Sequence, residues 1–385
     1  MTRIEKRDAV GSEGSNMRSL DKFRGCLIGG AAGDALGYAV EFLGYDDIIA
    51  KYGRRGITEY DLKDGVAEIS DDTQMSLFTA TGLLFGTTRG KMRGIMGSYP
   101  SYINGSYLDW LKTQCECYPL KKEFHYSWLV NIPEMFSSRA PGNTCMSALA
   151  RGGNGTIEEP INNSKGCGGI MRIAPIGIYF NDRNYVIENI DMIGAETAAL
   201  THGHELGYIP AAALVHIIHQ ITEKEGETIQ TAVLDSLEMM KKLFLNARHM
   251  GEFIALIEKA VELAGKNMPD IDAITQLGEG WVAEETLAIA VYCALKYSED
   301  FDKGIIAAVN HSGDSDSTGA VTGNILGAYL GYDAINAKWK YNLELNKIIR
   351  EISDDLYYDC QMNEYSHDVN NKWIAKYIDM NYIVV

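Results

Sequence analysis

Apolar residues recur at the three- and four-residue spacing of amphipathic helices along most of the chain from Leu20 onward. Residues 1–19 are polar and lack this period, and we expect them to form a flexible extension. The first periodic stretch, residues 20–42, predicts a helix that begins near Asp21. Its glycine and alanine residues would let a neighbouring helix or a ligand approach the backbone closely. The same period predicts helices within residues 70–86, 189–221, 231–245, 252–266, 285–298, 301–312 and 317–331.

Strand signals are few and short. Residues 169–180 contain several β-branched side chains, but Pro175 interrupts them. The chain has no repeat of fixed period and no linker rich in proline or serine. We therefore predict an all-α fold, a single large orthogonal helical domain over residues 20–385 that follows the extension of residues 1–19.

Composition and charge narrow the range of partners. The 52 acidic and 35 basic residues leave a net charge of −17, which opposes non-specific binding to nucleic acid or to an anionic membrane. The N-terminal residues have no apolar core of the signal-peptide kind, and no stretch approaches the roughly 18 apolar residues of a membrane span. The seven cysteines are scattered and include no C-x-x-C pair, which is typical of reduced thiols in a cytoplasmic protein.

Two acidic strings stand at predicted helix starts, "SDDTQ" at residues 70–74 and "HSGDSDSTG" at residues 311–319. Ser70 is a good N-cap for the first helix, and Ser315 or Ser317 can cap the second. Capping alone is one interpretation, because a helix N-terminus stabilises each nearby carboxylate by about 0.3–1 kcal/mol. However, four aspartates exceed what capping needs, and they would repel one another if gathered without a cation. Mg²⁺ and Mn²⁺ prefer carboxylate and hydroxyl oxygens, so the strings predict a two-metal centre if they meet in space.

Seven blocks of the sequence carry a resemblance to a known family. They are "GCLIGGAAGDALGYAVEF", "SDDTQM", "RAPGNTCMSAL", "GCGGIMRIAPIG", "THGH", "GWVAEETLAIAVYCAL" and "HSGDSDSTGAVTGNILGA", in that order between Leu20 and Tyr332. In these blocks the chain resembles the ADP-ribosylglycohydrolase family, which includes the dinitrogenase reductase-activating glycohydrolase and relatives that cleave ADP-ribosyl-arginine or ADP-ribosyl-serine. The resemblance implies an all-helical fold with a binuclear Mg²⁺ or Mn²⁺ centre in a cleft.

Residue roles follow from the resemblance position by position. The implied metal ligands are Ser70, Asp71, Asp72, Asp314, Asp316 and Ser317. Glu41 matches the family's mobile acid, and the acid–base role stays open between Glu41, Asp71 and Asp316. Cys167 stands where many relatives carry asparagine, which leaves its side-chain contact uncertain. The resemblance also implies a set of substrate-binding residues, and some of these would lie behind the metal ligands. They are Asp34, Gly166, Cys167, Gly168, Gly169, Met171, His202 and His204.

Other chemistry-bearing residues have both structural and functional interpretations. We expect the pair His216 and His219 to be structural, and Arg139 to hold a loop or to bind a carboxylate or phosphate. An adenine ring could stack on an aromatic residue, although packing in the core is the more common role. The candidates for that stacking are Trp281, Tyr102, Tyr107 and Trp110.

The implied function is a cytoplasmic, metal-dependent hydrolase that removes ADP-ribose from protein side chains, in the first place from arginine. Its partners would be an ADP-ribosylated protein and the product ADP-ribose, without nucleic acid or membrane. Hydrolysis of serine-linked or small-molecule ADP-ribose is an alternative. A two-metal nucleotide phosphoesterase, a binding protein without catalysis, and an immunity protein that reverses or blocks a toxin ADP-ribosyltransferase remain further alternatives.

Overall fold

Helices account for every regular element of the part of the chain that the computed structural model describes, residues 18–182, 184–367 and 369–381. Only isolated β-bridges occur there, which confirms the predicted all-α fold. None of the described helices combines the length and apolar character that crossing a bilayer requires. The α-helices are α1 (Leu20–Tyr38), α2 (Tyr45–Tyr52), α3 (Asp71–Arg93), α4 (Tyr99–Cys115), α5 (Asn143–Ala150), α6 (Ala174–Tyr179), α7 (Ile187–Ala199), α8 (Glu205–Glu223), α9 (Ile229–Leu243), α10 (Met250–Ala264), α11 (Asp270–Ile274), α12 (Ala283–Lys296), α13 (Phe301–Val309), α14 (Ser315–Leu330), α15 (Ala337–Lys340), α16 (Asn346–Tyr358) and α17 (Asn371–Tyr377). Three short 3₁₀ helices complete the set, η1 (Trp128–Asn131), η2 (Pro133–Phe136) and η3 (Cys167–Gly169).

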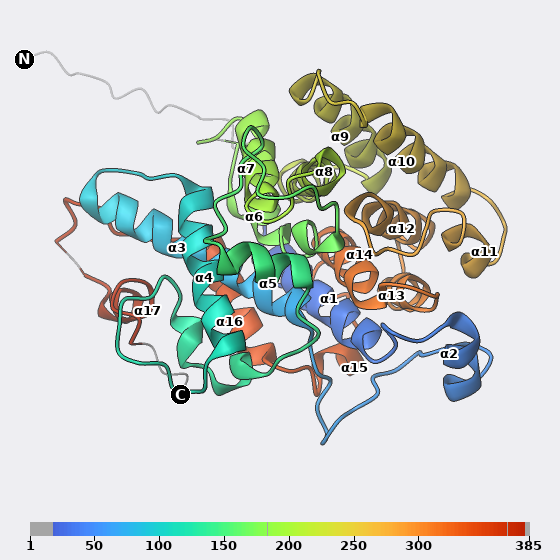
Figure 1. Ribbon diagram of the computed structural model, residues 1–385, viewed down its shortest axis with the longest axis horizontal. Helices are drawn as coiled ribbons and strands as arrows, with labels where there is room; N and C mark the ends of the chain where they lie inside the picture. The colour runs from blue at the N-terminus through green and yellow to red at the C-terminus, as the bar shows by residue number, and fades with distance from the viewer. Residues whose placement is uncertain (1–17, 183, 368, 382–385) are drawn as a thin grey trace, which may run out of the picture.

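Helices α1 and α14 lie side by side in the middle of the molecule, with α2 and α9–α11 on one side and α3, α4 and α17 on the other (Figure 1). Glycines at every fourth position line both helices where they meet. A methyl group on Gly29 would lie 2.3 Å from the carbonyl oxygen of Gly323, and one on Gly33 would lie 2.0 Å from that of Gly319. The two backbones are therefore in direct contact, and they run in opposite directions, so the end of α1 lies beside the start of α14.

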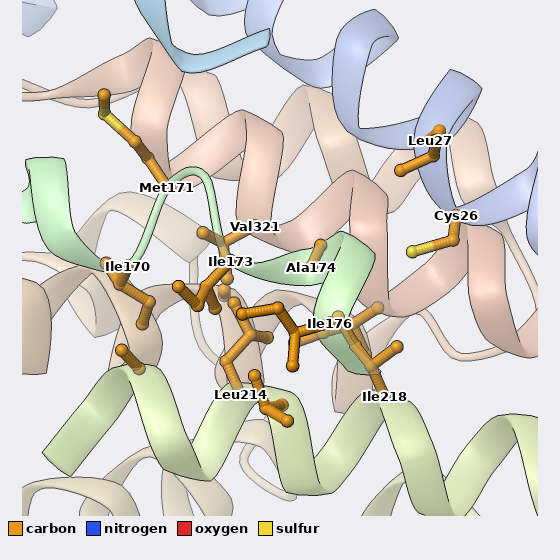
Figure 2. Packing of buried hydrophobic residues seen from close by; sticks show 14 of the residues in the cluster. Cys26, Leu27, Ile170, Met171, Ile173, Ala174, Ile176, Leu214, Ile218 and Val321 are labelled. Atoms are coloured by element: carbon orange, nitrogen blue, oxygen red, sulfur yellow. The ribbon is translucent and has the colours of Figure 1, made fainter. Parts of the chain in front are cut away.

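The segment with β-branched residues is helical in its second half, as α6. Figure 2 shows Ile173 and Ile176 packed between α1 and α14 above and Leu214 and Ile218 of α8 below. Because apolar residues face it from both sides, a short helix buries the segment completely. The strand signal of this stretch was therefore misleading.

The predicted helical region 189–221 is two helices, α7 and α8, separated by a turn at residues 200–204. Gly203 in this turn packs so tightly against another loop that a methyl group on it would lie 2.4 Å from the carbonyl oxygen of Asn162. His216 and His219 of α8 are buried and hydrogen-bond to Asp191 and Asp182 respectively, at 2.8 and 2.7 Å. They occupy the structural role expected from the sequence.

Residues 1–17 of the predicted extension lie outside the described residues. Its last two residues are part of the folded body. Arg18 donates to the carbonyl oxygens of Tyr179 and Phe180 at 2.8 and 2.9 Å, and Ser19 caps α1. The helical domain therefore includes at least Arg18 and Ser19.

The α1–α14 contact predicts that Gly29→Ala lowers the free energy of unfolding, at the upper end of the roughly 1–3 kcal/mol that overpacking costs, because the methyl group would collide with backbone. Urea unfolding measures the change. Gly251→Ala in α10 is the matched control, since nothing lies within 4 Å of a methyl group there. The control should leave stability unchanged or raise it by up to about 1 kcal/mol. Equal stabilities for the two variants would show that α1 and α14 can separate without cost.

Candidate active site

The two acidic strings line one cavity of about 490 Å³. The first string contributes Asp71 and Asp72, and the second contributes Asp314, Asp316 and Ser317. Ser70 is buried, and its side chain lies close enough to Asp316 to lower the pKa of that carboxyl. The strings, distant in the sequence, thus meet in one site.

Asp34 positions the first string. This buried α1 residue accepts hydrogen bonds from the backbone N–H of Ser70 at 3.0 Å and of Thr73 at 3.1 Å, and from the Thr73 hydroxyl. Ser70 is the N-cap of α3, as predicted, with its hydroxyl accepting from the N–H of Asp72 at 3.2 Å. Asp34 does not line the cavity, so the structure places it behind the site, where it holds the start of α3 against α1.

The second string begins α14 in a different way from the prediction. Its N-cap is Asp314, whose carboxylate accepts from the N–H of Ser317 at 3.2 Å, so the proposal of Ser315 or Ser317 as cap was wrong. Gly313 adopts a φ of 136°, and the N–H of Asp314 donates to the carbonyl oxygen of Glu279 at 2.8 Å. This turn lets the carboxylate of Asp314, which precedes both serines, reach the free N–H groups of the first turn of α14.

Carboxylates crowd the floor of the cavity. One oxygen each of Glu41, Asp314 and Asp316 lie within 4.8 Å of one another, and all three residues are buried. Burial, followed by repulsion from Asp316, raises the pKa of Glu41 to about 10 and that of Asp34 to about 7. The same two causes raise the pKa values of Asp71, Asp72 and Asp314 well above their usual range.

Two of these buried oxygens, Glu41 Oε2 and Asp72 Oδ2, have no hydrogen-bond partner among the described residues. Unpartnered buried carboxylate oxygens are costly unless a cation meets them. The donors are carboxylate and hydroxyl oxygens, the set that hard divalent cations prefer. The residues therefore fit a divalent metal.

A glycine-rich loop forms part of the cavity wall. Gly166, Cys167, Gly168 and Met171 line the cavity, whereas Gly169 lies behind it. The N–H of Cys167 donates to the carbonyl oxygen of Trp281 at 3.2 Å, which fixes the loop to the segment just before α12. Burial, followed by the charge of Asp314, raises the pKa of the Cys167 thiol, so the loop adjoins the second acidic string.

The two histidines of "THGH" lie in different environments. His202 lines the cavity and is buried, and burial together with the charge of Arg172 lowers its pKa to about 3. His204 lies outside the cavity lining and caps α8, its Nδ1 accepting from the N–H of Leu206 at 3.0 Å. Its ring packs on His249 with centroids 4.7 Å apart. The structure therefore places His202 in the site and His204 at a helix end beside it.

Of the candidate aromatic residues, only Trp281 lines the cavity. Tyr107 and Trp110 are fully buried in the core, and Tyr102 packs edge-on against Phe85. Arg139 forms ion pairs with Glu68 at 3.0 Å and Glu344 at 3.1 Å, the loop-holding role.

Sequence reasoning missed Phe42 and the backbone of residues 140–144. Phe42 is 72% exposed at the cavity and stacks on Trp281, with centroids 6.2 Å apart and planes at 22°. The sequence signal that could have identified Phe42 as a site residue was its position directly after Glu41. The N–H of Gly142 donates to Asp71 Oδ2 at 3.1 Å, a backbone contact that side-chain patterns do not reveal.

Comparison with known proteins places this cavity in a family. The family model described as ADP-ribosylglycohydrolase matches residues 15–366. The chain belongs to the ADP-ribosylglycohydrolase family. Family membership supports a glycohydrolase of the ADP-ribosyl class.

Two proteins named as ADP-ribosyl hydrolases are similar to this chain. The human ADP-ribosylhydrolase ARH3 is 27% identical over 47% of this chain and 54% of its own length. The ADP-ribosyl-[dinitrogen reductase] glycohydrolase of Rhodospirillum rubrum is 26% identical over 86% of this chain and 93% of its own length. A solved structure titled "ADP-ribosylglycohydrolase-related protein complex" matches with a TM-score of 0.57 and 22% identity, over 88% of this chain and 98% of that one. This last match supports the fold.

The crowded carboxylates predict opposite effects of Asp72→Asn with and without metal. In chelator the variant should be more stable than the wild type, by about 1–3 kcal/mol, because asparagine is neutral, whereas Asp72 must either bury its charge or take up a proton on folding. A divalent ion at about 100 times its Kd should stabilise the wild type by about 2.7 kcal/mol, and most of this gain should be lost in the variant. Thermal unfolding with EDTA, Mg²⁺ or Mn²⁺ measures both effects.

Asp333→Asn, at an exposed position beyond the far end of α14, is the control and should respond to metal like the wild type. An undiminished metal response in Asp72→Asn would show that Asp72 takes no part in holding the ion.

Proposed function

We propose that this protein is a metal-dependent hydrolase that removes ADP-ribose from ADP-ribosylated protein side chains, most of all from arginine. The observation that carries the proposal is the meeting of both acidic strings in one cavity that the glycine loop also lines. Family membership supplies the ADP-ribosyl chemistry. The free cysteines and the acidic composition support a cytoplasmic location for this reaction.

The ligands of two Mg²⁺ or Mn²⁺ ions would be the side chains of the acidic strings, with Glu41 beside them. When bound, such ions neutralise the carboxylates and polarise the oxygens that they coordinate. Support comes from the all-oxygen donor set and from the unpartnered oxygens of Glu41 and Asp72. The proposed ligands are Ser70, Asp71, Asp72, Asp314, Asp316 and Ser317.

An acidic protein can accept the anionic pyrophosphate of ADP-ribose because the cavity wall formed by the glycine loop carries no acidic side chain. Gly166, Cys167 and Gly168 line this wall, and Asn143 and Thr144 at the start of α5 line the cavity too. Backbone N–H groups in such loops and at helix starts bind phosphate oxygens. We assign the pyrophosphate to this wall and the distal ribose to the carboxylate floor.

Cleavage of the glycosidic bond builds positive charge on the ribose, which the surrounding carboxylates stabilise. Glu41 is our choice for the residue that protonates the leaving nitrogen. It follows α1 and adjoins the exposed Phe42, so it lies nearer the mouth than the helix-start aspartates. Without metal, burial and repulsion from Asp316 raise its pKa to about 10, the direction that favours the protonated form of a general acid. Asp71 or Asp316 would then act on the attacking water.

Phe42 and Trp281 support arginine as the linkage. Their stacked rings flank the mouth beside Glu41, where the group attached to the distal ribose would leave. Guanidinium groups stack on aromatic faces and pair with carboxylates, whereas a serine linkage presents no cation. The match to the dinitrogen reductase glycohydrolase over 86% of this chain supports a protein target.

The first experiment measures ADP-ribose release from arginine-ADP-ribosylated protein with Mg²⁺, with Mn²⁺ and with chelator. Release should require metal and fall at least about 100-fold in Asp316→Asn, a loss of the size that follows removal of a charge-stabilising group. Asp333→Asn should retain the wild-type rate. Release of phosphate in place of ADP-ribose would instead identify a phosphoesterase, and binding of ADP-ribose without release from any linkage would identify a binding protein.

The aromatic pair predicts a selective loss in Phe42→Ala and Trp281→Ala. The value of kcat/KM should fall about 10-fold on arginine-linked ADP-ribose, in line with the ~1–2 kcal/mol of a cation–π contact. It should change less than about 2-fold on serine-linked ADP-ribose, since that substrate has no guanidinium. Trp281→Phe keeps an aromatic face and should retain most activity. An equal loss on both substrates would assign the rings to adenine.

A further inference from the structure

Arg172 is a charged residue buried completely behind the glycine loop. Within the described residues it forms no ion pair with a carboxylate. Its guanidinium lies over the ring of Tyr107, with the central carbon 4.3 Å from the centroid, and Nη1 contacts Cys145 Sγ at 3.3 Å. An arginine is almost never buried without a carboxylate, because losing its hydration is costly. The burial of Arg172 therefore needs an explanation, and its shortest polar contact provides one.

That contact is with Thr201. Nη2 of Arg172 donates to Thr201 Oγ1 at 2.6 Å, and the same hydroxyl lies 2.8 Å from Nδ1 of His202. A guanidinium can only donate, so the threonine oxygen accepts from Arg172 and has its own proton left to donate. The thiol of Cys145 is also near this hydroxyl, but sulfur is a weaker acceptor than an imidazole nitrogen. The threonine proton therefore points to Nδ1 of His202.

A neutral imidazole that accepts at Nδ1 carries its proton on Nε2. Nε2 lies on the cavity side of the ring, against the glycine loop. A methyl group on Gly168 would be 3.3 Å from Nε2, and one on Gly166 would be 3.4 Å away. Burial and the nearby guanidinium charge keep the ring neutral, with a pKa of about 3.

We propose that Arg172 is a positioning residue that acts through Thr201 to fix His202 as its neutral Nε2–H tautomer. The cavity then presents one N–H donor of fixed direction beside the N–H groups of the glycine loop, aimed at an oxygen of the ADP-ribosyl group. The arrangement accounts for a buried cation without a carboxylate, since an acidic partner would compete for the guanidinium and release the threonine. The choice of ligand rests on the proposed function, whereas the tautomer does not.

The first test is the tautomer itself, read from ¹⁵N chemical shifts of the His202 ring in the full-length, Mg²⁺-loaded protein. His202→Gln identifies the signals by their loss. In the wild type Nε2 should be protonated and Nδ1 unprotonated from pH 5 to 8. Thr201→Val, which keeps the shape but removes the hydroxyl, should produce a mixture of tautomers, and Thr201→Ser should restore the single form. A protonated Nδ1 in the wild type, or unchanged signals in Thr201→Val, overturns the proposal.

The second test is the affinity for ADP-ribose, measured by calorimetry on the same proteins. Thr201→Val should weaken binding about 10-fold and raise KM more than it lowers kcat, and Thr201→Ser should bind within about 2-fold of the wild type. Arg172→Lys keeps the charge but misplaces the donor, and it should resemble Thr201→Val in both tests. A mixture of tautomers with unchanged affinity overturns the donor role. A wild type that shows the predicted tautomer but neither binds nor releases ADP-ribose supports the positioning of His202 by Arg172 through Thr201 and overturns the proposed function.

Discussion

The direct backbone contact between α1 and α14 is the constraint on which the rest of the structure depends. Glycines on both helices leave no room for side chains between them, so the helices lie closer together than ordinary packing allows. This closeness brings the end of α1, with Glu41 just beyond it, to the start of α14, with Asp314 and Asp316. A larger residue in place of one of these glycines would push α1 and α14 apart and so separate the carboxylates from one another.

The carboxylate cluster is tolerated because several independent features surround it. Asp34 is satisfied by N–H groups of the first turn of α3, and Asp314 by those of α14. One oxygen each of Glu41 and Asp72 has no hydrogen-bond partner within the described part of the chain. Without a cation these carboxylates repel one another, whereas a bound divalent ion would neutralise them and be coordinated by their oxygens. This is the electrostatic pattern of a metal centre.

The wall formed by the glycine loop has no acidic side chains, in contrast to the carboxylate cluster. Its shape comes from glycine backbone held by the Trp281 carbonyl and by the His202 ring. The buried guanidinium of Arg172 lies behind this wall and contributes positive potential without entering the cavity. The cavity thus combines an acidic region with a wall suited to anions, which matches a ligand that combines hydroxyl-bearing riboses with a pyrophosphate.

Much of this could be read from the sequence. The helical period of the core is local information, and it established the all-α class and most long helices. Ser70 as a cap follows from the residue types of one helix start, and the order of the seven blocks indicated the family. The tertiary structure alone decided the rest. His202 and His204 stand two residues apart, yet only His202 enters the cavity, because the chain turns there against a distant loop. Phe42 meets Trp281, and Arg172 reaches His202 through Thr201, only because α1, the glycine loop and the turn before α8 converge. Local periodicity specifies which face of a helix is apolar, whereas the partner of a side chain depends on which distant segments the packing of the whole core brings beside it.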